Sequence, residues 1–187
     1  MKNAADKGDE RFTYDDYLKW PDEERWELID GRAFNMTPAP STSHQTIVGN
    51  VNFILRTKLK NSPCRVFSSP TDVVLSEYDI VQPDVFVVCD QTKITSANIR
   101  GGPDVVFEVL SPSTILKDRR EKKRSYERCG VPEYVLLHPH PRYVEHYILE
   151  TDGLYGREET LGPEEILTLV TLNGLRIDLK EVFEGLL

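Results

Sequence analysis

The spacing of hydrophobic residues changes along the chain, and these changes predict where strands and helices lie. Residues 84–88 and 105–110 form two almost continuous apolar runs, which is typical of central strands covered on both faces of a sheet. Between residues 47 and 59 apolar positions recur every three to four residues, so this segment is predicted to be an amphipathic helix. Ser41 or Ser43 can cap it, because a serine hydroxyl accepts hydrogen bonds from the free amides of a first helical turn.

Turn-forming and capping residues mark the remaining elements. Thr13 and Asp16 fit a capping box that opens a short helix, and Asp-Gly at residues 30–31 predicts a β-hairpin. A basic segment at residues 117–128 is expected to be helical and to end at Gly130. Further strands are expected at 65–67, 72–75, 133–137, 143–149, 168–172 and 175–179, with a last helical turn near 180–183. This order of elements indicates a mixed α/β sheet.

Length and charge narrow the class of protein. The 187 residues suggest one domain at residues 12–187, after a polar and disordered lead-in at residues 1–11. The net charge of −8 argues against indiscriminate coating of nucleic acid, although it leaves room for a local basic face. The chain has no N-terminal signal-peptide pattern, and no apolar run approaches the roughly 20 residues that span a bilayer. A cytoplasmic protein without membrane contact is expected.

The cysteines favour the same compartment. Cys64, Cys89 and Cys129 are odd in number and far apart, and none belongs to a CxxC motif. Such cysteines are predicted to be reduced thiols of a cytosolic protein rather than a disulfide framework or a zinc site.

Each of the two apolar strand-like runs carries one acid, Asp84 and Glu108. Desolvating a carboxylate costs several kcal/mol unless a cation compensates for the lost hydration. An arginine could supply that cation, and the chain has many. Two strand carboxylates with a backbone carbonyl would also offer the hard oxygen ligands that Mg²⁺ prefers. The pattern leaves both interpretations open.

A lysine of the following helix could complete such a site. Ile115, Lys122 and Tyr126 fall on one helical stripe, whereas Lys123 lies about 100° further round, so Lys122 is predicted to face the sheet. Alternatively, Lys122 could pair with Asp118 four residues earlier, or pack its stem under the helix while its ammonium group reaches water.

The same helix could contact nucleic acid. Residues 117–128 contain seven basic and three acidic side chains, so Arg119 and Lys123 could meet a phosphate backbone, or they could belong to a solvated face with internal ion pairs. His44 could line the same cleft, although a histidine at a helix start needs no such role.

Several motifs resemble those of the Uma2 family of endonucleases, also known as DUF820. The matching motifs are QPD at Gln82–Asp84, PDVVFEVLSPST at Pro103–Thr114, the spacing of Asp118, Lys122 and Tyr126, GVPEY at Gly130–Tyr134, and the signature at Glu27–Gln45. The resemblance implies a restriction-endonuclease-like fold of the PD-(D/E)XK type. That fold has a mixed β-sheet flanked by helices, here with an N-terminal helix and β-hairpin.

The resemblance also implies roles for individual residues. Asp84 and Glu108 would be the metal-binding pair, holding Mg²⁺ or Mn²⁺. Leu110 stands where this motif usually has a lysine, so the role of that lysine would pass to Lys122. Glu27 would be an additional acidic member of the site.

The expected function is therefore metal-dependent hydrolysis of nucleic-acid phosphodiester bonds, with DNA as the expected substrate. A catalytically inactive nucleic-acid-binding or interaction module on the same fold is the alternative, and a network of acids and arginines without metal is a third. A homodimer stays open, because many nucleases of this fold cut duplexes as dimers.

Overall fold

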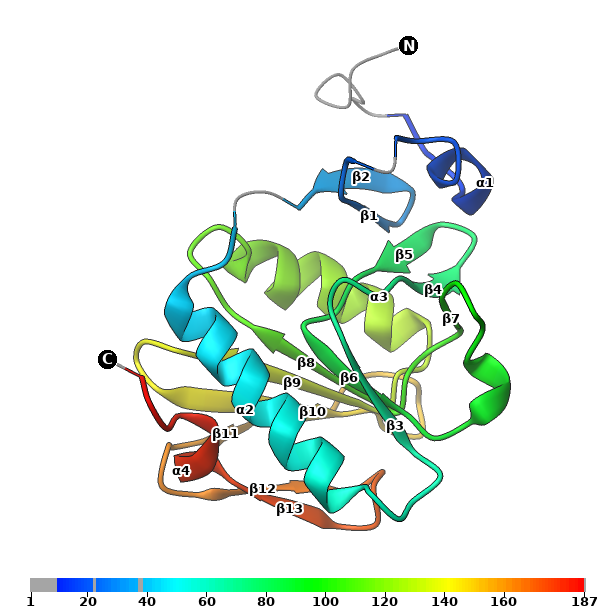
Figure 1. The fold of residues 1–187 in the computed structure, drawn as a ribbon. Helices are drawn as coiled ribbons and strands as arrows, with labels where there is room; N and C mark the ends of the chain where they lie inside the picture. Colours follow the sequence, from blue (N-terminus) through cyan, green and yellow to red (C-terminus); the bar gives the residue numbers. More distant parts are fainter. Residues whose placement is uncertain (1–9, 22, 37–38, 187) are drawn as a thin grey trace.

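The computed structural model describes residues 10–21, 23–36 and 39–186, which form β-sheets covered by a few helices (Figure 1). The predicted lead-in lies outside the described residues as far as residue 9. Arg11, which follows, pairs with Asp30 of the first hairpin at 3.0 Å. In the described ranges, no helix is long and apolar enough to cross a membrane.

The N-terminal part forms a small sheet of five strands in the order β2-β1-β5-β4-β7. The predicted capping box of Thr13 and Asp16 opens its helix, and the predicted hairpin turns at Asp30 and Gly31. Both turn residues have positive φ angles, 51° and 75°, as this two-residue turn requires. The elements are α1 (Tyr14–Tyr17), β1 (Trp26–Ile29), β2 (Arg32–Asn35), β4 (Val73–Ser76), β5 (Asp79–Val81) and β7 (Ile99–Arg100).

The central sheet has six strands in the order β11-β10-β9-β8-β6-β3. Its strands β8 and β9 run parallel, and the other neighbours run antiparallel, so the predicted mixed sheet is confirmed. Every residue of β6, β8 and β9 is buried, as the continuous apolar runs predict. The strands are β3 (Arg65–Ser68), β6 (Val85–Val88), β8 (Val105–Val109), β9 (Glu133–His138), β10 (Tyr143–Ile148) and β11 (Glu159–Leu161).

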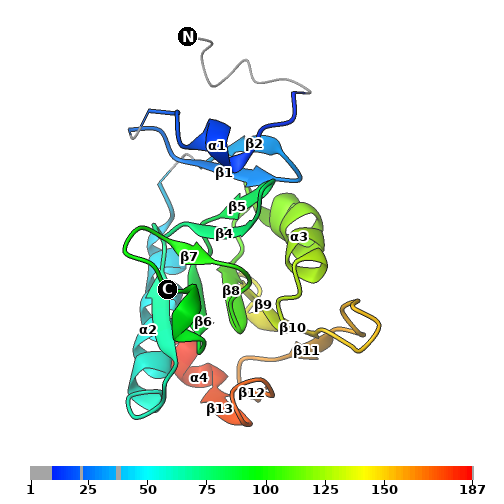
Figure 2. The ribbon, with the colours of Figure 1, turned by 90° about the vertical axis from the view of Figure 1, so that its right-hand side faces the viewer.

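Helices cover both faces of the central sheet (Figures 1 and 2). The long helix α2 (Thr42–Lys58), capped by Ser41, packs on the face that Val105 and Phe107 share. The helix α3 (Lys123–Arg128) packs on the opposite face, against Phe86 and Val106. The residues before α3, η3 (Lys117–Lys122), have π-helical hydrogen bonding, and η2 (Gln91–Lys93) is a single 3₁₀ turn. Gly130 ends α3 with a φ of 71°, as predicted.

The C-terminal residues form a hairpin, β12 (Ile166–Leu169) and β13 (Leu175–Asp178), followed by the helical turn α4 (Leu179–Val182). These elements close the core below α2. The predicted strand at 168–172 was placed too late, because the chain turns through Asn173 and Gly174, both with positive φ. The strands β5, β7 and β11 were not predicted from the pattern, since none is longer than three residues.

The prediction of three reduced thiols is wrong for two cysteines. Cys64 and Cys89 form a disulfide, and Cys129 is free. The antiparallel register pairs Arg65 of β3 with Val88 of β6, so the next position outward places Cys64 opposite Cys89. A separation of 25 residues in the sequence conceals this pairing.

Candidate active site

The four residues predicted to be catalytic come together from four parts of the chain. Glu27 lies on β1, Asp84 directly precedes β6, Glu108 lies on β8, and Lys122 ends η3. Glu108 points to the face of the central sheet that α3 covers. Glu27, on β1, lies next to it, and Lys122 contacts both acids. Glu27, Glu108 and Lys122 are almost completely buried, whereas the side chain of Asp84 is 17% exposed. The site therefore has a buried floor and one carboxylate that reaches solvent.

The ammonium group of Lys122 connects two of the acids. Its Nζ lies 2.8 Å from Oε1 of Glu27 and 2.8 Å from Oε1 of Glu108. Asp118 is further away, with 3.9 Å between its Oδ1 and the Nζ. The side chain of Lys122 is only 3% exposed, so its ammonium group does not reach water in the manner of a surface lysine. The prediction that Lys122 faces the sheet is confirmed.

Asp84 and Glu108 hold each other through the backbone. The amide of Asp84 donates to Oε2 of Glu108 at 3.3 Å, and the amide of Val109 donates to Oδ2 of Asp84 at 2.8 Å. His44, at the start of α2, places its Nε2 3.1 Å from the same Oδ2. Tyr126 donates its hydroxyl to Oε1 of Glu108 at 2.8 Å. The two carboxylates are thus fixed in position by neighbouring strands and by both covering helices.

A second lysine reaches the site through the π-helical turn. Lys117 donates to Oε2 of Glu27 at 2.6 Å, while Lys122 contacts the other oxygen of that carboxylate. Residues five apart point in different directions on an α-helix, but the i→i+5 repeat of a π-helix returns them to one side. The change in helix type at η3 is what allows both lysines to meet Glu27.

The pKa values of Glu108 and of Lys122 are both raised, but for different reasons. Burial raises the pKa of Glu108 to about 8; the charge of Lys122 opposes this shift, and Asp84, Asp118 and Glu27 increase it. Burial alone would lower the pKa of Lys122, but the acids Glu108, Glu27 and Asp118 raise it well above 10.5. Lys122 is therefore a permanent cation, and Glu108 holds a proton near neutral pH when no further cation is present.

The pKa of Glu27 is lowered rather than raised. Burial alone would raise its pKa, but the charges of Lys122 and Lys117 outweigh burial and lower the pKa to about 2. Glu27 also accepts a hydrogen bond from the amide of Gln82 at 2.9 Å. This ionised carboxylate holds both lysines in place.

A cavity of about 540 Å³ opens above these groups. Asp84 and Lys117 line it, and so does His44. Ser111, Ser113 and Thr114, from the loop after β8, add hydroxyl groups to the wall. The other lining residues are Arg25, Phe34, Asn35, Met36, Ala39, Pro40, Ser41, Gln45, Ser69, Pro112, Leu116 and Glu121. A polar ligand can therefore reach Asp84 from solvent.

The charges around the cavity floor do not balance. Four acids, Glu27, Asp84, Glu108 and Asp118, face two lysines, Lys117 and Lys122. A divalent cation at Asp84 and Glu108 would offset this excess and displace the proton from Glu108. In the described residues, no three His, Cys, Asp or Glu side chains form a ready metal site. Two carboxylates suit Mg²⁺, which keeps several of its waters. The residues present therefore fit the implied ion.

Two of the predicted nucleic-acid contacts point elsewhere. Arg119 donates to Glu145 of β10 and to the hydroxyl of Tyr143, at 3.1 Å for the latter. Lys123 places its Nζ 3.6 Å from the centre of the Tyr147 ring. Neither side chain lines the cavity, whereas His44 does. A role of Arg119 or Lys123 in nucleic-acid binding stays a prediction.

Sequence reasoning did not assign a role to several residues of the site. Lys117 was counted only as part of a basic segment, because the π-helical turn has no clear signal in the sequence. Gln82 accepts hydrogen bonds from Arg25 and donates to Asp72 at 2.9 Å, which fixes the loop before Asp84. Its place in the QPD motif was the available signal. Tyr126, in the spacing with Lys122, was another.

Comparisons with known proteins show the family and the fold. Residues 14–180 match the family described as "Uma2: Putative restriction endonuclease". The uncharacterized protein slr1290 of Synechocystis sp. is 28% identical over 147 residues, which cover 76% of this chain and 77% of the relative. The crystal structure of a "putative nuclease belonging to DUF820" from Anabaena variabilis superposes with a TM-score of 0.77 at 20% identity, covering 94% of this chain and 99% of that one. The predicted fold class is confirmed by this likeness, and the match over residues 14–180 shows that the chain belongs to the Uma2 family.

Proposed function

We propose that this protein is a metal-dependent endonuclease that hydrolyses phosphodiester bonds of nucleic acid, with DNA as the substrate. The observation that carries the proposal is a cluster of four carboxylates around two lysines, next to a solvent-accessible, polar cavity that Asp84 and Lys117 line. Burying three acids, with a fourth partly buried beside them, around two lysines is costly for folding alone, and the arrangement suits a site that takes a divalent cation.

Asp84 and Glu108 would hold Mg²⁺ or Mn²⁺. When bound, such an ion polarises a phosphoryl oxygen and lowers the pKa of a bound water. The hydrogen bonds from the Val109 amide and from His44 leave Oδ1 of Asp84 available on the cavity side. The hydrogen bond from the Asp84 amide to Oε2 of Glu108 holds the Glu108 carboxylate close to Asp84.

Lys122 would act as a fixed positive charge beside the reacting phosphate. Its ammonium group is held by Glu27 and Glu108, so it keeps its orientation without reorganisation when negative charge develops. Glu27 would position Lys122 and Lys117 rather than contact the substrate, because both its oxygens are occupied.

Cleavage of supercoiled plasmid and of single-stranded DNA with Mg²⁺ or Mn²⁺ tests the proposal. Wild type is compared with Lys122→Ala and Glu108→Ala, and with Glu145→Gln as a control that alters a buried acid away from the cavity. Metal-dependent cutting that both site variants abolish and Glu145→Gln retains would support the proposal. Cutting that survives both site variants would contradict it. Binding of DNA without cutting would favour the non-catalytic module.

A further inference from the structure

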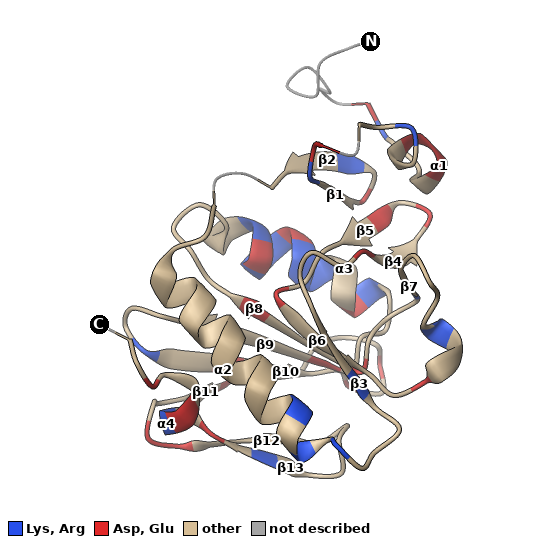
Figure 3. Cartoon of the chain, in the orientation of Figure 1, with Lys and Arg blue, Asp and Glu red and all other residues tan. Residues whose placement is uncertain are grey.

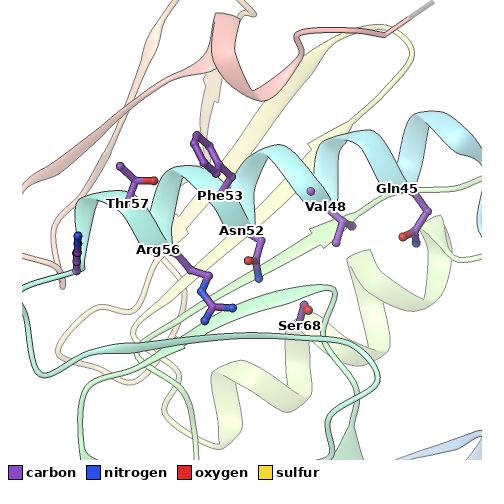
Figure 4. A pocket seen from close by; sticks show the side chains of 9 residues that line it. Gln45, Val48, Asn52, Phe53, Arg56, Thr57 and Ser68 are labelled. Carbon is purple, nitrogen blue, oxygen red and sulfur yellow. The ribbon is translucent and has the colours of Figure 1, made fainter.

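The outer face of α2 carries a second hollow that the proposed site does not use (Figure 4). Its volume is about 610 Å³, and it runs along the helix beside Ser68 of β3. Gln45 lines both this groove and the cavity above Asp84, and Ser68 is followed by Ser69, which lines that cavity. The groove therefore adjoins the candidate active site at Gln45. Its other lining residues are Val48, Gly49, Asn52, Phe53, Arg56, Thr57 and Lys60.

Polar and basic side chains form one stripe along this groove. Gln45, Gly49, Asn52 and Arg56 stand at i, i+4, i+7 and i+11, so they share one side of the helix, and Lys60 lies two residues after the helix ends at Lys58. Figure 4 shows Gln45, Asn52 and Arg56 on the side of α2 that faces Ser68. Within the described part of the chain, neither Arg56 nor Lys60 has an acidic partner.

The charge of this region differs from that of the whole protein. The 41 residues from Gly31 to Thr71 contain five Lys and Arg and no Asp or Glu, although the chain has 31 acids and a net charge of −8. Figure 3 shows α2 without acidic positions and with basic ones at its C-terminal end. An acid-free face beside a site with excess carboxylates is suited to a polyanion that must approach that site.

Gly49 leaves open space along the groove that the fold does not need. A glycine in the middle of a helix is unfavourable relative to alanine, and it is normally explained by a close neighbour. Here a Cβ atom at Gly49 would meet nothing within 4 Å, so no described part of the protein requires the glycine. Its exposed backbone lies in the floor of the groove, where a bound chain could come close.

Phe53 lies at the border of the stripe and is 72% exposed. An exposed aromatic ring beside a basic track is how proteins bind unpaired nucleic-acid strands, because bases stack on the ring while cations follow the backbone. A second copy of this chain could also cover Phe53. The absence of acidic residues from residues 31–71 and the position of the groove next to the cavity favour a strand of nucleic acid as the occupant.

We propose that α2 guides an unpaired strand of nucleic acid into the candidate active site, with Arg56 and Lys60 on its phosphates and a base over Phe53. From Gln45 to its end at Lys58 the helix is about 20 Å long at 1.5 Å per residue, which is roughly six phosphates of one strand at duplex spacing. This inference rests on the proposed function, since it assigns the substrate strand to that same site.

Binding of a fluorescent single-stranded oligonucleotide of about 12 residues, without metal, tests the track. Replacing Arg56 and Lys60 together by alanine should weaken binding and lower the slope of log K against log salt by about 1.4, since each phosphate contact contributes about 0.7. Phe53→Ala should weaken binding by about five- to a hundredfold, the range expected from loss of one stacked base. Lys180→Ala, which removes an exposed cation paired with Glu164, should leave binding unchanged.

Gly49→Gln separates a ligand-binding role from a structural one. The substitution fills the groove but improves helix propensity, so it should raise the melting temperature by about 1–2 °C while weakening binding. Unchanged binding in all three α2 variants would overturn the inference. So would a wild-type dimer that Phe53→Ala and Gly49→Gln dissociate while DNA binding persists.

A small phosphodiester, bis(p-nitrophenyl) phosphate, distinguishes failure of the track from failure of the catalytic site. With Mg²⁺ or Mn²⁺, the α2 variants should hydrolyse it as wild type does, because it occupies only the cavity. Normal hydrolysis with unchanged oligonucleotide binding would refute the track alone. The wild-type protein could also hydrolyse neither DNA nor bis(p-nitrophenyl) phosphate while the α2 variants lose oligonucleotide binding. That result would refute the proposed function and support the track.

Discussion

One helical segment places cations on two groups of buried acids, and the two groups differ in a way that separates function from folding. In the first, the site cluster, Lys122 contacts Glu27 and Glu108. In the second, the β10 cluster, Arg119 contacts Glu145, whose Oε1 also lies 2.9 Å from Nε2 of His138. Tyr147 of the β10 cluster donates to Oε2 of Glu145 at 2.9 Å.

The oxygens of Glu145 are both occupied by groups of the protein, and so are those of Glu108, so the two acids differ in their electrostatic surroundings rather than in their contacts. Burial would raise the pKa of Glu145, but the contacts with His138, Arg119 and Tyr147 lower the pKa to about 2. In the site cluster burial raises the pKa of Glu108 to about 8 instead; Lys122 opposes this rise, and the neighbouring acids add to it. A buried acid alone therefore does not indicate a site. The site cluster differs from the β10 cluster in having excess negative charge next to a cavity, which is the observation behind the proposed function.

The largest expected effect is that of Lys122→Met. Removing this cation leaves Glu27 and Glu108 buried without it, so the free energy of unfolding should fall by about 3–5 kcal/mol. Urea denaturation measures this change. Lys123→Met, next to it and partly exposed, is the control and should cost much less. A loss below about 1 kcal/mol for Lys122→Met would mean that the site cluster is not held together by this charge.

Metal should stabilise the protein through the site cluster only. At a Mg²⁺ concentration of about 100 times Kd, the folded state should gain about 2.7 kcal/mol. Thermal melting with increasing Mg²⁺ measures the gain, which Asp84→Asn should abolish and Glu145→Gln should retain. Equal stabilisation of wild type and Asp84→Asn would place the ion elsewhere, and no stabilisation of wild type would favour a network without metal.

Glu145→Gln tests the β10 cluster as a structural element. The amide cannot pair with Arg119 as a carboxylate does, so about 1–3 kcal/mol of stability should be lost, as for a charged hydrogen bond. Cleavage of DNA by the folded fraction should be unchanged. A variant that folds normally but no longer cuts would show that the two clusters are coupled.

The most diagnostic effect, and the smallest when it is counted per pH unit, is the pH dependence of stability. Folded Glu108 keeps its proton up to pH about 8, whereas the unfolded carboxyl loses it near 4.5, so stability should fall as pH rises between these values. The slope for one proton is at most about 1.4 kcal/mol per pH unit. Glu145, with its pKa lowered to about 2, should instead lose stability as pH falls from about 4.5.

Urea denaturation of Glu108→Gln and Glu145→Gln across pH 2 to 9 separates the two contributions. Glu108→Gln should flatten the neutral limb of the stability profile, and Glu145→Gln the acidic limb. A neutral limb that is identical in wild type and Glu108→Gln would show that Glu108 is ionised in the folded protein.

Much of the fold was predictable because the strongest elements carry local signals. The runs that became β6 and β8 are apolar on both faces, and α2 has an unbroken helical repeat after the Ser41 cap. The hairpin turn was equally clear, since an Asp-Gly pair adopts positive φ readily. Short strands such as β7 were missed because two residues have no periodicity.

The sequence by itself pointed to the candidate residues: Glu108 in a strand that must be buried, Asp84 next to another such strand, and Lys122 at helical spacing from Tyr126. Only the tertiary structure decided how they are used. The π-helical turn brought Lys117 to Glu27, the register of β3 and β6 joined Cys64 to Cys89, and Arg119 went to Glu145. Each of these contacts joins residues distant in the sequence, and strand register and helix packing, rather than local preference, determine which of them meet.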